Sequence, residues 1–110
     1  MLKKRYRLLV FRTKSKAKKI DAGPFVLKIS KNNKAYSRFG FTVSKAYDKK
    51  AVVRNKIKRQ VRAVIEEMFA KILTGMDILF VVKRSAKDLD KKKLKDIMLK
   101  TLEKEKLING

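Results

Sequence analysis

Residues 51–73 read AVVRNKIKRQVRAVIEEMFAKIL, and the spacing of the apolar residues in this stretch decides much of the fold. They recur every three or four positions, the period of a helix with one apolar face: Val53, Ile57, Val61, Val64, Ile65, Met68, Phe69 and Ile72. The spacing predicts an amphipathic helix over about residues 51–73, with Asp48 as its N-cap and Gly75 just past its end. Because one face of this helix is apolar, another element must cover it.

Three segments around this helix have the patterns of β-strands. Residues 25–30 and 37–44 alternate between apolar and polar side chains, which predicts a hairpin turned at Asn32-Asn33 with one apolar and one polar face. Residues 77–83 contain a short, continuous run of β-branched and aromatic side chains, which predicts a strand buried on both sides. A last helix is predicted over about residues 89–107, with Asp88 or Asp90 as its cap and an apolar stripe formed by Leu94, Ile97, Met98 and Leu102.

These elements predict a single small domain of the α/β class, an α+β sandwich over residues 1–110. Its sheet is mixed and mainly antiparallel, and both helices lie on the apolar face of the sheet. Residues 1–23 are expected to form a basic arm, with a short strand around Leu8–Phe11, since nine basic residues and no acid occur in the first twenty positions.

The charge of the chain indicates a polyanionic partner. The 110 residues include 32 basic and 10 acidic side chains, a net charge of +22, whereas solubility requires only about 2–8 charges in a small domain. Nucleic acid is the favoured partner, and an anionic membrane surface is the alternative. The chain has no cysteine and no histidine, which excludes disulfides, thiolate metal sites and imidazole catalysis. No apolar run is long enough to cross a bilayer, so a cytoplasmic protein is expected.

The strongest local signal is a basic cluster in residues 45–62, which hold eight basic side chains and one acid. On a helical wheel, five potential hydrogen-bond donors fall within about 140° of one another: Arg54, Asn55, Lys58, Arg59 and Arg62. Like charges four residues apart destabilise a helix unless an anion neutralises them, and arginine binds phosphate with two hydrogen bonds. This face is therefore interpreted as a nucleic-acid contact rather than as ordinary solvated surface.

The polar face of the predicted hairpin carries Lys28, Arg38, Thr42 and Ser44. On so basic a protein it is a possible floor for a single-stranded polyanion. Composition alone also allows an ordinary solvated sheet face, and slightly favours it.

Residues 51–62 resemble the signature of the bacterial ribonuclease P protein subunit, an Ala-Val-x-Arg-Asn-Arg-x-Lys-Arg-x-x-Arg pattern. The resemblance extends to residues 39–45 and 25–27, which are similar to the family's two preceding strands, and to its basic opening at residues 3–8. Four features depart from the pattern. Lys56 replaces a second arginine, and Lys28 replaces a frequent aromatic residue. The connection from Ser44-Lys45 to Arg54 is one residue longer than usual, and its residues 46–50 lack the common glycine. Residues 9–23 are short for the family's first helix, with only Phe11 for its usual pair of aromatic residues.

The resemblance implies a sandwich with a left-handed β-α-β crossover, which is a rare handedness. It implies a protein that binds a catalytic RNA and the 5′ leader of precursor tRNA and assists removal of that leader. In this reading the RNA, with Mg²⁺ that it mainly holds itself, cleaves the leader, so the chain has no catalytic residue and no metal site of its own. The resemblance places Lys45, Arg54, Asn55, Lys56, Lys58, Arg59 and Arg62 against the catalytic RNA, and Phe11, Val26, Lys28, Thr42 and Ser44 in the leader cleft.

The expected partners are the ribonuclease P RNA and precursor tRNA, with neither a membrane nor an obligate protein partner. Two other functions fit a small basic chain: a ribosomal or other RNA-binding protein, and a toxin that cleaves mRNA by itself. The basic helix signature disfavours the first. The second is disfavoured because the tyrosines Tyr6, Tyr36 and Tyr47 form no recognisable site with basic residues, and the acids are scattered.

Overall fold

The computed structural model describes residue 7 and residues 18–108 of the chain. In chain order the elements are β1 (Lys18–Asp21), β2 (Phe25–Lys31), β3 (Arg38–Val43), α1 (Ala51–Met68), the 3-10 turn η3 (Phe69–Lys71), β4 (Met76–Val82), the 3-10 turn η4 (Arg84–Asp88) and α2 (Lys91–Lys104). The predicted short strand at residues 8–11 and the predicted leader residue Phe11 lie outside the described residues.

The sheet has the order β1-β2-β4-β3, so the predicted hairpin between β2 and β3 is wrong. Strand β4 lies between them, antiparallel to β2 and parallel to β3. The six-residue connection 32–37 is long enough to leave a gap of one strand, and the continuous apolar sequence of β4 requires a neighbour on each side. The partner of β2 on its other side is β1, which pairs with it through the short connection 22–24. Strand β1 was not predicted, because its residues were assigned to the basic arm.

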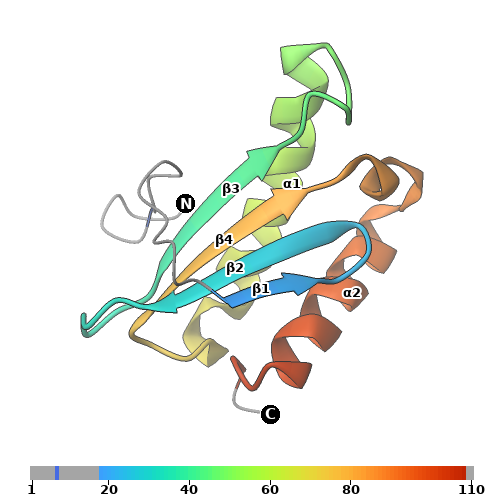
Figure 1. Ribbon diagram of the computed structural model, residues 1–110. Coiled ribbons are helices and arrows are strands. Elements are labelled where there is room, and N and C mark those ends of the chain that lie inside the picture. Colours follow the sequence, from blue (N-terminus) through green and yellow to red (C-terminus); the bar gives the residue numbers. More distant parts are fainter. Residues whose placement is uncertain (1–6, 8–17, 109–110) are drawn as a thin grey trace.

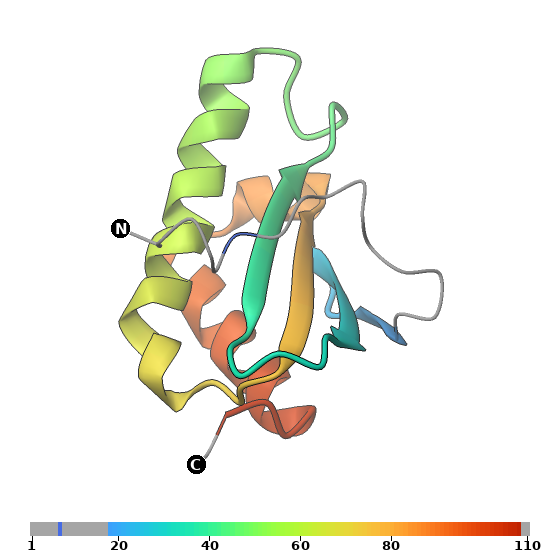
Figure 2. The ribbon, with the colours of Figure 1, turned by 90° about the vertical axis from the view of Figure 1, so that its left-hand side faces the viewer.

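Both helices cover one face of this sheet, as predicted (Figure 2). In Figure 1, β3 and β4 point in the same direction, α1 lies behind the sheet, and β4 is to the right of β3. The connection from β3 through α1 to β4 is therefore left-handed, against the usual preference for right-handed crossovers. The mixed sheet, the layers and the handedness agree with the predicted α+β sandwich.

The core lies between the helices and one face of the sheet. Its sheet side contains Phe25, Leu27, Phe39, Ile78 and Phe80, all at most 1% exposed. Helix α1 contributes the stripe predicted from its sequence, of which Ile57, Val61, Val64, Ile65 and Met68 are buried. Helix α2 contributes Leu94, Met98 and Leu102. The apolar periodicity of both helices thus corresponds to the surface that they bury.

The ends of the helices differ from the predictions in two respects. Helix α1 begins after Lys50, which has no side-chain cap, so Asp48 is not its N-cap; the Asp48 carboxylate instead accepts a hydrogen bond from the Lys50 N–H. Gly75 has a φ of +83° and leads into β4, separated from the end of α1 by η3. Asp90, in contrast, caps α2 as predicted, by accepting a hydrogen bond from the Lys93 N–H at 2.8 Å.

A buried ion pair fixes the connection between β2 and β3. Asp77 of β4 accepts two hydrogen bonds from the Arg38 guanidinium, at 2.8 and 2.6 Å, and one from the Asn32 amide at 3.0 Å. The same Asn32 nitrogen donates to the Tyr36 carbonyl oxygen at 3.0 Å. Pairing with Asp77 raises the pKa of Arg38 further. Arg38 is therefore part of the fold and is not a free cation on the sheet.

Candidate nucleic-acid interface

The N-terminal half of α1 presents the basic face that the sequence predicts. Asn55, Lys56 and Arg59 are exposed, and Lys58, at the edge of the buried stripe, is half-buried. Within the described part of the chain, none of these four side chains forms an ion pair or a side-chain hydrogen bond with another residue. Their donors are therefore available to an external anion.

Two arginines of the predicted set are engaged within the protein instead. The Nη1 of Arg54 donates to the carbonyl oxygens of Asp48 and Lys49, both at 2.8 Å, and so ties the preceding loop to the helix. The guanidinium of Arg62 lies 5.7 Å from the centre of the Phe41 ring, and its Nε is buried without a hydrogen-bond partner. Arg54 and Arg62 thus shape the face, while Lys56, Lys58 and Arg59 are its available cations.

The loop between β3 and α1 extends the basic face into a depression. An open depression of about 560 Å³ is lined by the cations Lys45, Lys49, Lys50, Arg84 and Lys87, together with Ala46 and Asp48. The first turn of α1 contains no acid and its N-terminus has no side-chain cap. The positive end of the helix dipole and these cations make the depression favourable for phosphate.

Asp48 is the acid within this depression, and it organises the loop. Its carboxylate accepts hydrogen bonds from the Lys50 N–H at 2.8 Å and from the Lys87 ammonium at 2.9 Å. These two bonds lower the pKa of Asp48, the backbone bond having the larger effect. Lys87 also lies 5.8 Å from the centre of the Tyr47 ring, and burial raises the pKa of that tyrosine. Lys87 is therefore partly neutralised, and the other four cations carry most of the positive charge.

The predicted leader residues gather on the sheet face opposite the helices. Val26 aligns with Val81 of β4, and Val81 aligns with Thr42 of β3, so all three side chains lie on this face. Lys28 lies one step along, beside Leu79. Val26 is only 8% exposed and Leu79 only 2%, whereas Lys28 and Thr42 are half-buried. The apolar side chains on this face of the sheet are thus less exposed to solvent than the alternating sequence pattern of the strands predicted.

Ser44 and Lys45 connect the two predicted surfaces. Ser44 follows the last residue of β3 and its N–H donates to the Val82 carbonyl oxygen at 3.2 Å, while its hydroxyl accepts from the Ala46 N–H at 3.0 Å. Lys45 is exposed at the start of the depression. The polar sheet face and the basic face of α1 therefore lie on opposite sides of the sheet and meet at the end of β3.

Sequence reasoning did not identify three residues at this interface. Arg84 and Lys87 reach the depression from η4, and only the fold brings them beside the β3–α1 loop. Val52 is 80% exposed, three positions before Asn55 and seven before Arg59, so it lies on the basic face. The available signal was its apolar side chain outside the helical stripe.

In residue 7 and residues 18–108, no group of three or more acidic side chains is placed to hold a metal ion. The helices in this part of the chain are also too short or too polar to span a membrane.

Comparison with known proteins gives a consistent match. Residues 3–106 match the family model described as Ribonuclease P. The ribonuclease P protein component of Microcystis aeruginosa is 48% identical over 50 residues, which is 46% of this chain and 42% of that protein. That of Alkaliphilus metalliredigens is 33% identical over 104 residues, covering 94% of this chain and 89% of the relative.

A solved structure agrees with the fold. The Staphylococcus aureus RNase P protein superposes with a TM-score of 0.84 at 28% identity, over 94% of this chain and 98% of that one. With the family model covering nearly the whole sequence and the same architecture observed, the chain belongs to the ribonuclease P protein family.

Proposed function

We propose that this chain binds the catalytic RNA of ribonuclease P and the 5′ leader of precursor tRNA, and assists removal of that leader. The observation that carries the proposal is the unneutralised basic face of α1, where Lys58, Arg59 and the depression at the helix N-terminus offer donors to phosphate. Family membership supplies the identity of the RNA. A protein of the ribosome with the same charge would not share this family.

The α1 face is the proposed contact for the catalytic RNA. Lys45, Asn55, Lys56, Lys58 and Arg59 bind phosphates or base edges directly, and Val52 packs against a sugar or base between them. Arg54 holds the loop that carries Lys49 and Lys50, so it acts as a positioning residue. Arg62 offers its remaining nitrogens while its side chain rests on Phe41.

The opposite sheet face is the proposed contact for the leader. Lys28 supplies its positive charge, because Arg38 is already neutralised by Asp77, and Thr42 and Ser44 supply hydroxyl groups. Placing the leader there and the catalytic RNA against α1 lets the protein connect enzyme RNA and substrate around the end of β3.

The chemistry of cleavage is assigned to the RNA and to Mg²⁺ that the RNA holds. The described residues offer no carboxylate cluster for a metal, and the chain contains no histidine for acid–base catalysis. The chain's contribution is electrostatic: neutralised phosphates repel one another less, so less Mg²⁺ is needed. The proposed location of the complex is the cytoplasm, with no membrane and no obligate protein partner.

Reconstitution with a bacterial ribonuclease P RNA tests the proposal. Cleavage of precursor tRNA at the mature 5′ end is measured across Mg²⁺ concentrations with RNA alone, chain alone, and both. The chain alone is expected to be inactive, and adding it to the RNA is expected to lower the Mg²⁺ midpoint. The double variant Lys58→Ala/Arg59→Ala should lose most of this shift, whereas the matched pair Lys92→Ala/Lys93→Ala, exposed on α2, should retain it. Correct cleavage by the RNA-free chain, or an unchanged midpoint, refutes the proposal.

A further inference from the structure

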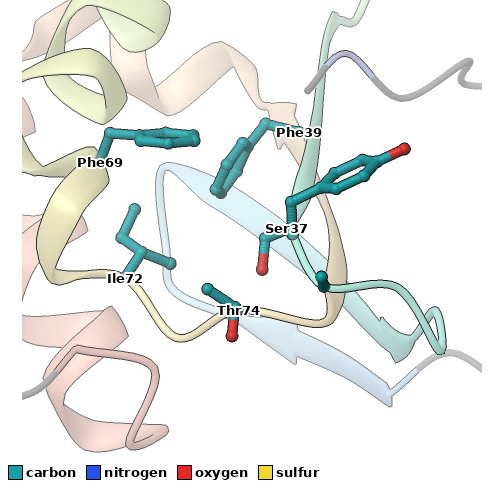
Figure 3. Close-up of a pocket in the computed structure, with 7 residues that line it drawn as sticks. Ser37, Phe39, Phe69, Ile72 and Thr74 are labelled. Atoms are coloured by element: carbon teal, nitrogen blue, oxygen red, sulfur yellow. The ribbon is translucent and has the colours of Figure 1, made fainter. Parts of the chain in front are cut away.

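Two hollows at opposite ends of the sheet differ in charge. The pocket where β3 begins has uncharged side chains in its described lining, with Phe39 and Phe69 along one side (Figure 3). The depression where β3 ends is lined by cations of the β3–α1 loop (residues 44–50) and of η4, together with the acid Asp48. Asp48 is also the one acid of residues 45–62, among eight basic residues. An acid at this place weakens the attraction for phosphate unless it has a second role.

Asp48 binds Lys87 across the depression. Its Oδ2 accepts a hydrogen bond from the Lys87 Nζ at 2.9 Å, and its Oδ1 accepts one from the Lys50 N–H at 2.8 Å. The Lys87 ammonium also donates to the Tyr47 carbonyl oxygen at 3.4 Å and lies 5.8 Å from the centre of the Tyr47 ring. One lysine of η4 is thus held by three groups of the β3–α1 loop.

These contacts are the polar link between the β3–α1 loop and η4. In the described part of the chain, every hydrogen bond, ion pair and ring contact between these two segments involves Lys87. The other cations of the depression are like charges, so they repel one another. The Asp48 side chain is only 20% exposed, which shields its attraction for Lys87 from water. The pair therefore opposes the repulsion that would separate the two segments.

The position of Lys87 also determines that of Arg84. Element η4 is a 3-10 helix, in which residues three positions apart lie on the same side. Arg84 and Lys87 accordingly line the depression together, while Ala86 between them is 1% exposed and anchors η4 in the core. Holding Lys87 against the β3–α1 loop therefore keeps the Arg84 side chain beside the lysines of that loop.

We propose that Asp48 is a positioning residue for RNA binding: its pair with Lys87 holds Arg84 against the β3–α1 loop, so that the cations of both segments bind one RNA together. The inference rests on the proposed function, which identifies the catalytic RNA, and adds that an acid is required for tight binding. Asp48 lies outside the family signature at residues 51–62, in the loop that is one residue longer than usual and lacks the common glycine.

Binding of a bacterial ribonuclease P RNA to the intact chain, measured across salt concentrations, tests the proposal. Asp48→Asn keeps an oxygen that can accept from the Lys50 N–H, but removes the charge that holds Lys87. A simple sum of charges predicts stronger binding, because one negative charge leaves the depression. Positioning by Asp48 predicts an affinity at least about threefold lower and a slope of log affinity against log salt reduced by about one, the loss of one phosphate contact.

Matched variants separate positioning from charge. Glu67→Gln removes the same charge and an exposed ion pair, with Lys95 at 2.7 Å, outside the lining of the depression, and should not weaken binding. Lys87→Met should reproduce the loss, whereas Lys87→Arg, which can still pair with Asp48, should retain most of the affinity. Arg84→Met should cost less affinity in the Asp48→Asn background than in the parent, because Arg84 is no longer held there. All chains are compared well below their thermal midpoints.

An unchanged or higher RNA affinity in folded Asp48→Asn, or strictly additive losses with Arg84→Met, would overturn the inference. Either result leaves the proposed function standing, since the Lys58→Ala/Arg59→Ala variant tests that function separately. A parent chain that binds no catalytic RNA would overturn both. Should Asp48→Asn fail to fold, equal affinities of Lys87→Met and Lys87→Arg would overturn the inference instead.

Discussion

The ion pair between Arg38 and Asp77 gives a sharp test of how the sheet is held together. The Asp77 side chain is 8% exposed and the Arg38 side chain 30%, and the carboxylate accepts three hydrogen bonds from Arg38 and Asn32. Replacing Asp77 by alanine removes all three bonds and leaves a guanidinium without its counter-charge. Breaking a fully buried pair costs about 3–5 kcal/mol. Because Arg38 can still reach water, we expect a loss of about 2–4 kcal/mol in the free energy of unfolding.

The opposite single change should be at least as costly. Arg38→Met takes the two guanidinium hydrogen bonds and the counter-charge away from the nearly buried Asp77 carboxylate, so a loss of about 3 kcal/mol or more is expected. The double variant Arg38→Met/Asp77→Leu removes both charges, and should lie within about 1 kcal/mol of the parent. It should also bind precursor tRNA like the parent, because Arg38 contributes no free charge to the sheet face.

Urea unfolding followed by far-UV circular dichroism measures these free energies. For a domain with a total stability of about 5–15 kcal/mol, the expected losses are large. A loss below about 1 kcal/mol in Asp77→Ala, or losses in the double variant equal to the sum of the single ones, would show that the pair does not hold β3 and β4 together. A large loss of affinity for precursor tRNA in a folded double variant would instead show that Arg38 contributes to binding of the leader.

Three further predictions concern the interface. Arg59→Ala should weaken binding to the catalytic RNA and reduce the slope of log affinity against log salt by about one, with the thermal midpoint of unfolding unchanged. Arg54→Ala should also lower the thermal midpoint, because the Asp48 and Lys49 carbonyls lose their donor. Equal stability of the two variants would contradict this assignment. Thr42→Glu should reduce affinity for precursor tRNA but not for mature tRNA, measured by filter binding, and equal losses would place the leader elsewhere. Sulfate should raise the thermal midpoint more than chloride at equal ionic strength, since an anion that binds only the folded state stabilises that state. Coincident midpoints in the two salts would mean that the anions act only by screening the charges and that the protein has no preformed phosphate site.

A fifth prediction uses pH. The pKa of Asp48 is lowered in the folded state, so its contribution to stability is complete above its unfolded value of about 4 and is lost as pH falls through the lower folded value. Asp48→Asn should therefore be less stable than the parent at neutral pH, and the difference should shrink in acid. Unfolding curves at matched ionic strength decide this, and a difference independent of pH would mean that the carboxylate charge is not what stabilises the loop.

The helices were predictable from sequence because their signal is local. The buried residues of α1 are those whose spacing has the helical period, and Asp90 caps α2 as its side chain predicts. The sheet order was not predictable in this way, since alternation shows which face a strand buries and not which strand lies beside it. One clue was available: the continuous apolar run of β4 requires a strand on each side, and β2 and β3 were two predicted strands that could supply them.

The candidate site, like the fold, was predictable from sequence only where the signal is local. Residue types and helical spacing predicted a basic face on α1, and its exposed members lie there. Spacing could not show which cations are free, because the partners come from elsewhere in the fold. Arg54 binds carbonyl oxygens of the preceding loop, Arg62 rests on Phe41 of β3, and Arg38 pairs with Asp77 of β4.

These three arginines have a common physical role, which explains why a chain of charge +22 can keep a compact fold. Each guanidinium has a planar set of donors that can bond a carbonyl or carboxylate, or lie over an aromatic ring, inside the protein. Apart from Lys87, which pairs with Asp48, the lysines at the interface form no ion pair or side-chain hydrogen bond within the described residues, so salt screens their repulsion until phosphates replace it. The arginines thus fix the positions from which the lysines and Arg59 act. A functional map based on charge alone would overestimate Arg38, Arg54 and Arg62 as RNA contacts. It would also miss Arg84, which the parallel pairing of β4 with β3 brings beside the β3–α1 loop.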